Sequence, residues 1–245
     1  MSAHDASPTV VAHRGFSAVA PENTIIALRM AAATGASACE FDVRRCADGA
    51  LVLMHDASVD RTTDGSGAVA RLDLPAIEEF DAGSAKSPAF AGERVPTLRA
   101  ALACLSELGA RAVVEIKDRG IGEAVARAIA AEGMTESATV ISFEAGDLVE
   151  VRGALADLPT GLLAGKERPL GELVEAARSC GASILDVDHR VLSAAFVCDA
   201  RAAGLEVWTW TVNDAGRMRE LASWGVTAIT TDNPYRGVSI FGRAR

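Results

Sequence analysis

The sequence predicts an α/β fold, a (β/α)8 TIM barrel, from its length, its alternating pattern and one missing motif. Short apolar runs of β-type residues alternate with longer stretches of helical periodicity through most of the 245 residues. Eight such units fit the size of a closed barrel better than an open doubly wound sheet. No GxGxxG sequence follows the first strand, which weakens a dinucleotide-binding alternative.

The predicted strands are nearly continuous in apolar character, which indicates a sheet covered on both faces. They lie at residues 9–12, 39–43, 112–116, 139–142, 160–163, 183–187, 206–211 and 227–230. The helical stretches are clearest at residues 24–33, 122–131, 170–179, 194–203 and 214–224. Several of them run into a glycine, such as Gly181 and Gly225, which adopts the left-handed conformation that ends a helix.

One segment departs from this rhythm. After the second strand and an extended run at residues 51–55, residues 57 to about 95 are irregular and rich in Asp, Gly, Ser and Pro. We interpret this segment as a small insertion that forms an enlarged loop over one mouth of the barrel. Because no linker or strong repeat interrupts the rest, residues 1–245 are predicted to form a single barrel domain.

The composition excludes several classes of protein. A chain that is 49% hydrophobic and 23% charged is an ordinary globular one and is not disordered as a whole. Its 24 Lys and Arg residues against 33 Asp and Glu residues give a net charge of −9. Such a surface does not attract a polyanion by bulk charge, so we predict no nucleic-acid partner.

The cysteines and the apolar runs suggest where the protein works. None of the five cysteines forms a CxxC pair, which is typical of buried free thiols in a reducing compartment. Residues 1–9 lack the features of a secretion signal, and no apolar run approaches the roughly 18 residues that span a bilayer. We therefore expect a cytoplasmic protein with no membrane insertion; the sequence carries no signal of its oligomeric state.

Polar side chains stand at the carboxyl ends of the predicted strands, where a parallel barrel places its reacting groups. The first strand is followed by His13 and Arg14. The second carries Glu40 and Asp42, and the two-residue period of a strand puts both carboxylates on one face. We expect these side chains to point into one mouth of the barrel.

The next two extended segments add similar groups. The run at residues 51–55 ends in His55, and the strand at residues 112–116 brings Glu115 with Lys117 just beyond it. Three carboxylates buried together need a cation, and oxygen ligands without sulfur select a hard one, Mg²⁺ or Ca²⁺. The alternative is that Glu40 and Asp42 form ion pairs with Arg44 or Lys117. The third carboxylate, Glu115, at the same position on the next strand, favours the metal site over these ion pairs.

The histidines and the cationic side chains suggest acid–base chemistry on a phosphate. His13 and His55 flank the carboxylates, and imidazoles suit proton transfer near neutral pH. Either could instead be a hydrogen-bonded structural residue. If the carboxylates hold a metal ion, Arg14 and Lys117 need another anion, and a phosphate group fits them.

These residues belong to motifs that resemble the glycerophosphodiester phosphodiesterase family. In family order they are His13-Arg14-Gly15, Pro21-Glu22-Asn23-Thr24, Glu40-Phe41-Asp42-Val43, Asp48-Gly49, His55-Asp56, Arg61-Thr62-Thr63 with Gly65 and Gly67, Val95-Pro96-Thr97-Leu98, Glu115-Ile116-Lys117, Trp210-Thr211-Val212-Asn213 and Thr230-Thr231-Asp232-Asn233-Pro234. The ordered set covers nearly the whole chain, from Val10 to Pro234, and is highly specific. One departure, Arg45-Cys46-Ala47 in place of Thr-Lys or similar, affects only loop detail.

The resemblance implies a barrel with a small inserted region and one divalent cation. The family's metal ligands correspond to Glu40, Asp42 and Glu115, and its two catalytic histidines correspond to His13 and His55.

The resemblance also assigns substrate-binding groups. The family's phosphate-binding cations correspond to Arg14 and Lys117, and its ring beside the glycerol moiety corresponds to Trp210. Packing within the barrel is the alternative role for Trp210. Glu22 and Asn23 are expected to orient the loop that carries the first histidine.

The expected reaction is hydrolysis of a small glycerophosphodiester to sn-glycerol 3-phosphate and an alcohol, with His13 as base and His55 as acid. The glycerol 2-hydroxyl could attack first and form a cyclic phosphate, or water could attack directly. One alternative is a lysophospholipase D-type or other phosphodiesterase activity at the same site, with an apolar patch near residues 80–90. Another is a catalytically silent binding barrel, which predicts that a ligand or a histidine is missing, and none is.

Overall fold

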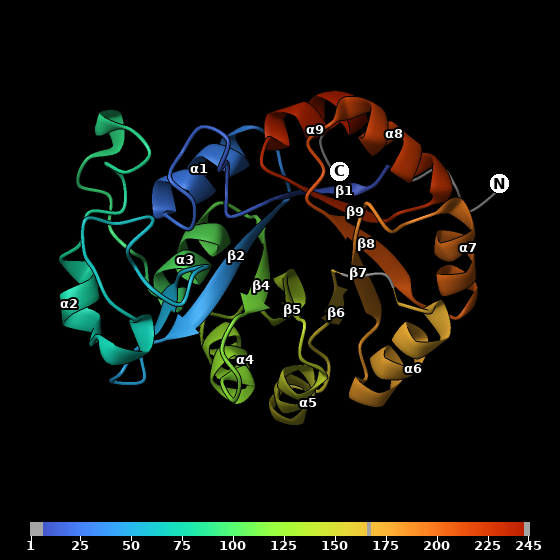
Figure 1. The fold of residues 1–245 in the computed structure, drawn as a ribbon, viewed down its shortest axis with the longest axis horizontal. Coiled ribbons are helices and arrows are strands. Elements are labelled where there is room, and N and C mark those ends of the chain that lie inside the picture. The colour runs from blue at the N-terminus through green and yellow to red at the C-terminus, as the bar shows by residue number, and fades with distance from the viewer. Residues whose placement is uncertain (1–6, 166–167, 243–245) are drawn as a thin grey trace.

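The computed structural model describes residues 7–165 and 168–242. Within these residues the strands form one sheet in the order β1-β9-β8-β7-β6-β5-β4-β2-β3, and pairing of β1 with β2 closes it into a barrel (Figure 1). Neighbouring strands are parallel except β2 and β3, which are antiparallel. The predicted (β/α)8 barrel is confirmed, with β3 as an extra strand on the outside of the ring.

The elements follow one another along the chain much as the apolar pattern predicts. The strands are β1 (Thr9–Ala12), β2 (Ala38–Arg45), β3 (Leu51–Leu53), β4 (Arg111–Ile116), β5 (Ala138–Ser142), β6 (Thr160–Ala164), β7 (Ile184–Asp188), β8 (Glu206–Trp210) and β9 (Ala228–Thr231). The helices are α1 (Ile25–Ala33), α2 (Leu74–Glu78), α3 (Leu98–Glu107), α4 (Gly122–Ala131), α5 (Ala145–Ala154), α6 (Leu170–Cys180), α7 (Ala194–Ala202), α8 (Ala215–Trp224) and α9 (Pro234–Phe241). Every predicted strand and helix overlaps an observed one.

Side-chain caps and glycines set the ends of the helices. Thr24 accepts a hydrogen bond from the amide of Ala27 at the start of α1, and Asp214 does the same for Arg217 in α8. Helices α6 and α8 end at Gly181 and Gly225, whose φ angles of 72° and 94° are left-handed.

Helices α3, α5 and α9 complete the ring around the strands. Gly146 and Gly153 interrupt the apolar pattern of α5. In α9, a Cβ added at Gly237 would lie 2.7 Å from Cγ1 of Val10, so glycine lets this helix pack closely on β1. Helix α5 therefore depends on tertiary packing more than on a strong periodic signal.

The core has two parts. The larger one fills the space between the strands and the helices. The smaller one fills the inside of the barrel, and its members are Val11, Ala38, Val113, Ile141, Leu163, Ile184, Trp208 and Ala228. Four of the five cysteines are buried as expected, whereas Cys198 on α7 is exposed, which corrects the expectation for that thiol.

Residues 57–95 leave the barrel as an irregular excursion that contains α2 and lies to one side of it (Figure 1). The excursion has its own small apolar cluster, which packs on β3: Cys46, Val52, Met54, Val59, Val69, Ile77, Ala82 and Val95. In the part of the chain that the structure describes, no helix is long and apolar enough to cross a membrane.

Candidate active site

A pocket of about 220 Å³ opens at the carboxyl ends of the barrel strands. Its walls come from the barrel strands and the loops that follow them: His13, Arg14, Glu40, His55, Glu115, Lys117, Ile141, Phe143, Leu163, Asp186, Trp210, Thr211 and Thr230. The structure therefore brings seven of the eight predicted site residues to one pocket. The eighth, Asp42, is fully buried between them.

The three predicted carboxylates meet at the β2 side of this pocket. Glu40, Asp42 and Glu115 each place an oxygen within 4.8 Å of the others. Their exposed fractions are 2%, 0% and 8%. The parallel register, in which Asp42 pairs with Glu115, produces this convergence because it aligns like-facing positions of β2 and β4.

Two cationic side chains neutralise part of this charge. The Arg14 Nε atom lies 3.0 Å from Oδ2 of Asp42, and the Lys117 Nζ atom lies 3.0 Å from Oδ1 of Asp42 and also contacts Glu115. Arg44, the other cation considered from the sequence, instead pairs with Asp118. The predicted ion pairing with Lys117 therefore occurs. Together, Lys117 and Arg14 balance two of the three carboxylate charges and leave one unbalanced.

Burial and the unbalanced charge shift the pKa values of the three carboxyl groups. Burial, with repulsion from Asp42 and Glu115, raises the pKa of Glu40 well above its usual range. Burial, followed by the Asp42 charge, raises the pKa of Glu115 to about 7. Burial also disfavours ionised Asp42, but Lys117 and Arg14 outweigh it and lower the Asp42 pKa.

The donor set fits a hard divalent cation. Among the described residues, Oε1 of Glu40 is buried without a hydrogen-bond partner, and Oδ1 of Asp42 is contacted by the Lys117 ammonium at 3.0 Å. Buried carboxylate oxygens without partners are costly, and a cation satisfies both the charge and the lone pairs. The acidic cluster can therefore bind a metal through oxygen ligands alone.

A strained turn brings the first histidine and Arg14 into the pocket. Arg14 has a φ of 52° and Gly15 a φ of 80°. A Cβ at Gly15 would lie 2.5 Å from the backbone carbon of Ala27, so the turn both needs glycine and packs on α1. In this conformation the Arg14 amide donates a 2.9 Å hydrogen bond to Oε2 of Glu40.

Glu22 and Asn23 hold this turn in place, as expected for positions that orient the loop. Glu22 accepts a 2.9 Å hydrogen bond from Arg14 Nη1. The Asn23 side chain donates to Oδ2 of Asp42 at 2.8 Å and accepts from the Asp42 amide at 3.2 Å. Both residues thus connect the loop after β1 to the acidic cluster.

Each histidine at the pocket has a carboxylate on its Nδ1 atom. His13 Nδ1 lies 2.6 Å from Oδ1 of Asp232, and His55 Nδ1 lies 2.7 Å from Oδ1 of Asp56. Hydrogen bonds from His13 help to hold the pKa of Asp232 at about 2, against the opposing effect of burial. An ionised carboxylate only accepts, so His13 Nδ1 carries the proton of this hydrogen bond.

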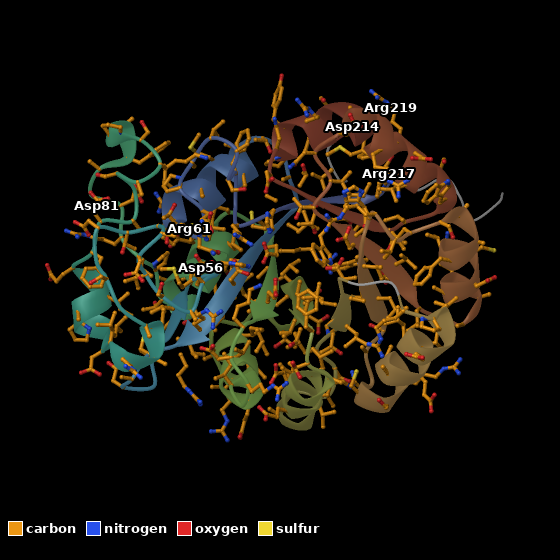
Figure 2. All side chains as sticks on the ribbon, viewed as in Figure 1. Asp56, Arg61, Asp81, Asp214, Arg217 and Arg219 are labelled. Carbon is orange, nitrogen blue, oxygen red and sulfur yellow. The ribbon has the colours of Figure 1, made fainter. Side chains whose placement is uncertain are left out.

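Arg61 of the excursion supports the second pair. Its guanidinium binds Asp56 through Nε at 2.6 Å and Glu22 through Nη1 and Nη2 at 2.9 and 2.8 Å. Figure 2 shows Asp56 and Arg61 beside each other on the excursion side of the barrel. Burial lowers the pKa of His55, and the charge of Asp42 and the hydrogen bond with Asp56 partly offset this effect.

The opposite wall of the pocket is mostly apolar. Trp210 lies edge-on to Phe143 with ring centroids 5.8 Å apart, and Ile141 and Leu163 lie beside them. The Trp210 indole donates a 3.2 Å hydrogen bond to the backbone carbonyl of Asp186. Trp210 therefore lines the pocket and also packs within the barrel, and its contact with a glycerol moiety stays a prediction.

The sequence does not predict the roles of several groups at the site. Asp232 stands in the motif after the last strand and Arg61 in the motif after His55, but no local pattern predicts that Asp232 contacts His13 or that Arg61 contacts Asp56. Asp186 interrupts an apolar strand with a charge, and Phe143 follows directly after another strand; these were the available signals.

The apolar patch that a lysophospholipid would need is not formed by residues 80–90. Phe80 packs against the apolar cluster of the excursion, and Phe90 is half-buried. The exposed aromatic ring beside the pocket is instead Phe143, at 48%.

The chain is similar to known proteins over nearly its whole length. The model of the glycerophosphoryl diester phosphodiesterase family matches residues 13–236. A glycerophosphodiester phosphodiesterase of Caldanaerobacter subterraneus is 34% identical over 230 residues, which cover 92% of this chain and 94% of that protein.

Solved structures give the same result. A phosphodiesterase of Oleispira antarctica in complex with the product sn-glycerol-3-phosphate is 29% identical, with a TM-score of 0.87 and 96% of both chains covered. A glycerophosphodiester phosphodiesterase of Agrobacterium tumefaciens is 28% identical, with a TM-score of 0.83 over 95% of this chain and 99% of that one. The family match and the full-length relative establish the identity: the chain belongs to the glycerophosphodiester phosphodiesterase family and is an enzyme of that family.

Proposed function

We propose that the enzyme hydrolyses glycerophosphodiesters to sn-glycerol 3-phosphate and an alcohol. The observation that carries the proposal is the convergence, in one pocket, of two imidazoles, two cationic side chains and an acidic cluster. The product bound to the Oleispira antarctica relative supports the same class of substrate. The span of the family match, residues 13–236, also supports one barrel domain for this chain.

Glu40, Asp42 and Glu115 would hold one divalent cation, Mg²⁺ or Ca²⁺, through their carboxylate oxygens. When bound, the cation would supply Lewis-acid stabilisation of the charge that develops on the phosphoryl oxygens. Arg14 and Lys117, which pair with these carboxylates, line the same pocket and would bind the phosphate oxygens of the substrate.

The histidines would move the protons. Asp232 fixes the proton of His13 on Nδ1, so Nε2 would accept the proton of the attacking hydroxyl. His55, held by Asp56, would donate a proton to the oxygen of the departing alcohol. The attacking group is the glycerol 2-hydroxyl, which forms a cyclic phosphate that water then opens, or water itself.

Hydrolysis of glycerophosphocholine tests the function. We expect the wild-type enzyme to release sn-glycerol 3-phosphate, a chelator to stop the reaction, and added Mg²⁺ or Ca²⁺ to restore it, because the carboxylates need the cation. Failure to release sn-glycerol 3-phosphate would overturn the proposed activity, and full activity in the presence of chelator would overturn the role of the acidic cluster.

A substrate without the attacking hydroxyl separates the two routes. The phosphocholine ester of 1,3-propanediol has the same phosphate and leaving group but no 2-hydroxyl. Loss of turnover with this analogue supports attack by the 2-hydroxyl, and turnover near that of glycerophosphocholine supports attack by water.

A further inference from the structure

Asp186 is a pocket residue that the proposed reaction does not use. It lies in the middle of β7, between Leu185 and Val187, which belong to the core outside the barrel. The alternation of a strand therefore turns Asp186 to the inside, where it lines the pocket with an exposed fraction of 2%.

The carboxyl group of Asp186 has an unused oxygen. In residues 7–165 and 168–242, no atom forms a hydrogen bond with its Oδ1 atom. Buried polar groups in native proteins nearly always have a partner, because an unpaired one destabilises the fold. An unpaired group on the wall of a binding pocket is therefore a candidate contact for a ligand.

The position of Asp186 in the ring of strands decides which part of a ligand it could reach. The order β2-β4-β5-β6-β7 places β7 across the barrel from β2, which carries Glu40 and Asp42. The phosphate-binding groups Arg14 and Lys117 belong to the β2 side. A phosphodiester held there would direct an organic group toward β7.

The surroundings of Asp186 favour a small alcohol. Ile141 and Leu163 line the same pocket, and the Trp210 ring is anchored on the Asp186 carbonyl. A short carbon chain would contact these apolar groups, and its hydroxyl needs a polar partner. A carboxyl accepts a hydrogen bond from a hydroxyl whether it is ionised or neutral.

We propose that Asp186 binds a hydroxyl group of the glycerol moiety and thereby determines the preference of the pocket for glycerol phosphates. The proposal rests on the proposed function, since it concerns the same pocket and the same class of substrate. It assigns Asp186 a role in binding and none in proton transfer.

Ligand binding by titration calorimetry in the presence of Mg²⁺ tests the proposal. The two probes are sn-glycerol 3-phosphate and methyl phosphate, which has the same charged group but no hydroxyl. We expect Asp186→Leu to weaken binding of sn-glycerol 3-phosphate about tenfold, the value of one hydrogen bond, and to leave methyl phosphate binding unchanged. Asp186→Asn, which keeps a hydrogen-bonding group, is expected to lose less.

A matched control is Thr160→Val. Thr160 is also buried, and among the described residues its hydroxyl has no hydrogen-bond partner, but it does not line the pocket. We expect this variant to bind both probes like the wild type. Asp186→Ala adds no bulk to the barrel and replaces Asp186→Leu if that variant does not fold.

Three results would overturn the role of Asp186: an equal loss for both probes, no loss for either, or wild-type binding of sn-glycerol 3-phosphate no tighter than that of methyl phosphate. The proposed function is read separately, from release of sn-glycerol 3-phosphate by the wild-type enzyme. A protein that discriminates the two probes through Asp186 but releases no product would refute the function and keep the binding site.

Discussion

Each of the two histidines contacts an aspartate through Nδ1, but the two pairs depend on different parts of the molecule. His13 follows β1, and its partner Asp232 follows β9, 219 residues away in sequence and adjacent in the barrel. His55 follows β3, and its partner is the next residue, Asp56. The first pair therefore exists only when the barrel is closed, whereas the second can form within a single turn of chain.

The contacts around the two carboxylates differ in the same way. Asp232 is bound by Asn213 Nδ2 at 2.6 Å and by Ser17 at 3.1 Å, both on loops at the carboxyl ends of the strands. Asp56 depends on Arg61, which comes from the excursion and is half exposed. The His13 site is thus fixed by the barrel, and the His55 site is fixed by a surface ion pair.

Removal of either imidazole is the largest change and asks whether both sites are needed. We expect His13→Ala and His55→Ala each to lower kcat by roughly 10²–10⁴, the usual contribution of a positioned acid or base. The measurement is release of sn-glycerol 3-phosphate from glycerophosphocholine. If one variant kept wild-type turnover, the corresponding site would have no part in proton transfer.

Removal of the carboxylate charges tests the two supporting contacts. Asp232→Asn and Asp56→Asn each replace an acceptor by a group whose amide can also donate, so the imidazole loses its fixed proton on Nδ1. A hydrogen bond to a charged group contributes about 1.5–3 kcal/mol, which corresponds to a loss of kcat of roughly 10- to 100-fold.

The comparison predicts the order of these losses. Asp232→Asn should cost more, because Asn213 and Ser17 keep the new amide in place beside His13, whereas the side chain at position 56 is held by the half-exposed Arg61. Histidine NMR spectra report the Nδ1 and Nε2 proton positions in each variant. Equal losses would show that the barrel and the excursion hold their histidines equally firmly, and reversed losses would show that the excursion holds its histidine more firmly.

Removal of Arg61 isolates the contribution of the excursion. Ion pairs between exposed groups contribute about 0.2–1 kcal/mol, so Arg61→Ala should lower kcat by roughly two- to fivefold, and Arg61→Lys by less. High salt should reduce the difference from wild type, because it screens the pair.

The control is Arg99→Ala on α3, which removes a surface ion pair with Glu132 at the end of α4. We expect the control to keep wild-type turnover at all salt concentrations. A loss larger than tenfold in Arg61→Ala would mean that Arg61 also acts through Glu22, which holds the Arg14 turn.

The sequence predicts the barrel and its charged wall better than its supporting contacts. Strand positions follow from apolar runs, and Glu40, Asp42 and Glu115 converge because a period of two and a parallel register leave them no other arrangement. Side chains that act within or directly after a strand are therefore predictable.

Contacts made by loops are not predictable in the same way. The pairing of His13 with Asp232 requires the closure of the barrel, and the pairing of Arg61 with Asp56 requires the path of an irregular segment. Neither follows from a local pattern. Asp186 is a different case, because strand alternation turns it inward but only the assembled pocket shows that its oxygen lacks a partner among the described residues.

The dependence of thermal stability on acid pH measures the His13–Asp232 contact directly and is the smallest effect that we expect. The pKa of Asp232 is about 2 in the folded protein and 3.8 for an ordinary aspartate. Because the folded value is the lower one, the ionised carboxylate stabilises the fold above pH 3.8, and this stabilisation is lost as the pH falls through 2.

Wild-type protein should therefore exceed Asp232→Asn in thermal stability near neutral pH, and the difference should shrink between about pH 4 and 2. The hydrogen bonds from Arg61 and His55 also lower the pKa of Asp56, so the sign of the pH dependence is the same there. A difference for Asp232→Asn that stays constant across this range would mean that Asp232 acts on the fold through packing and not through its charge on His13.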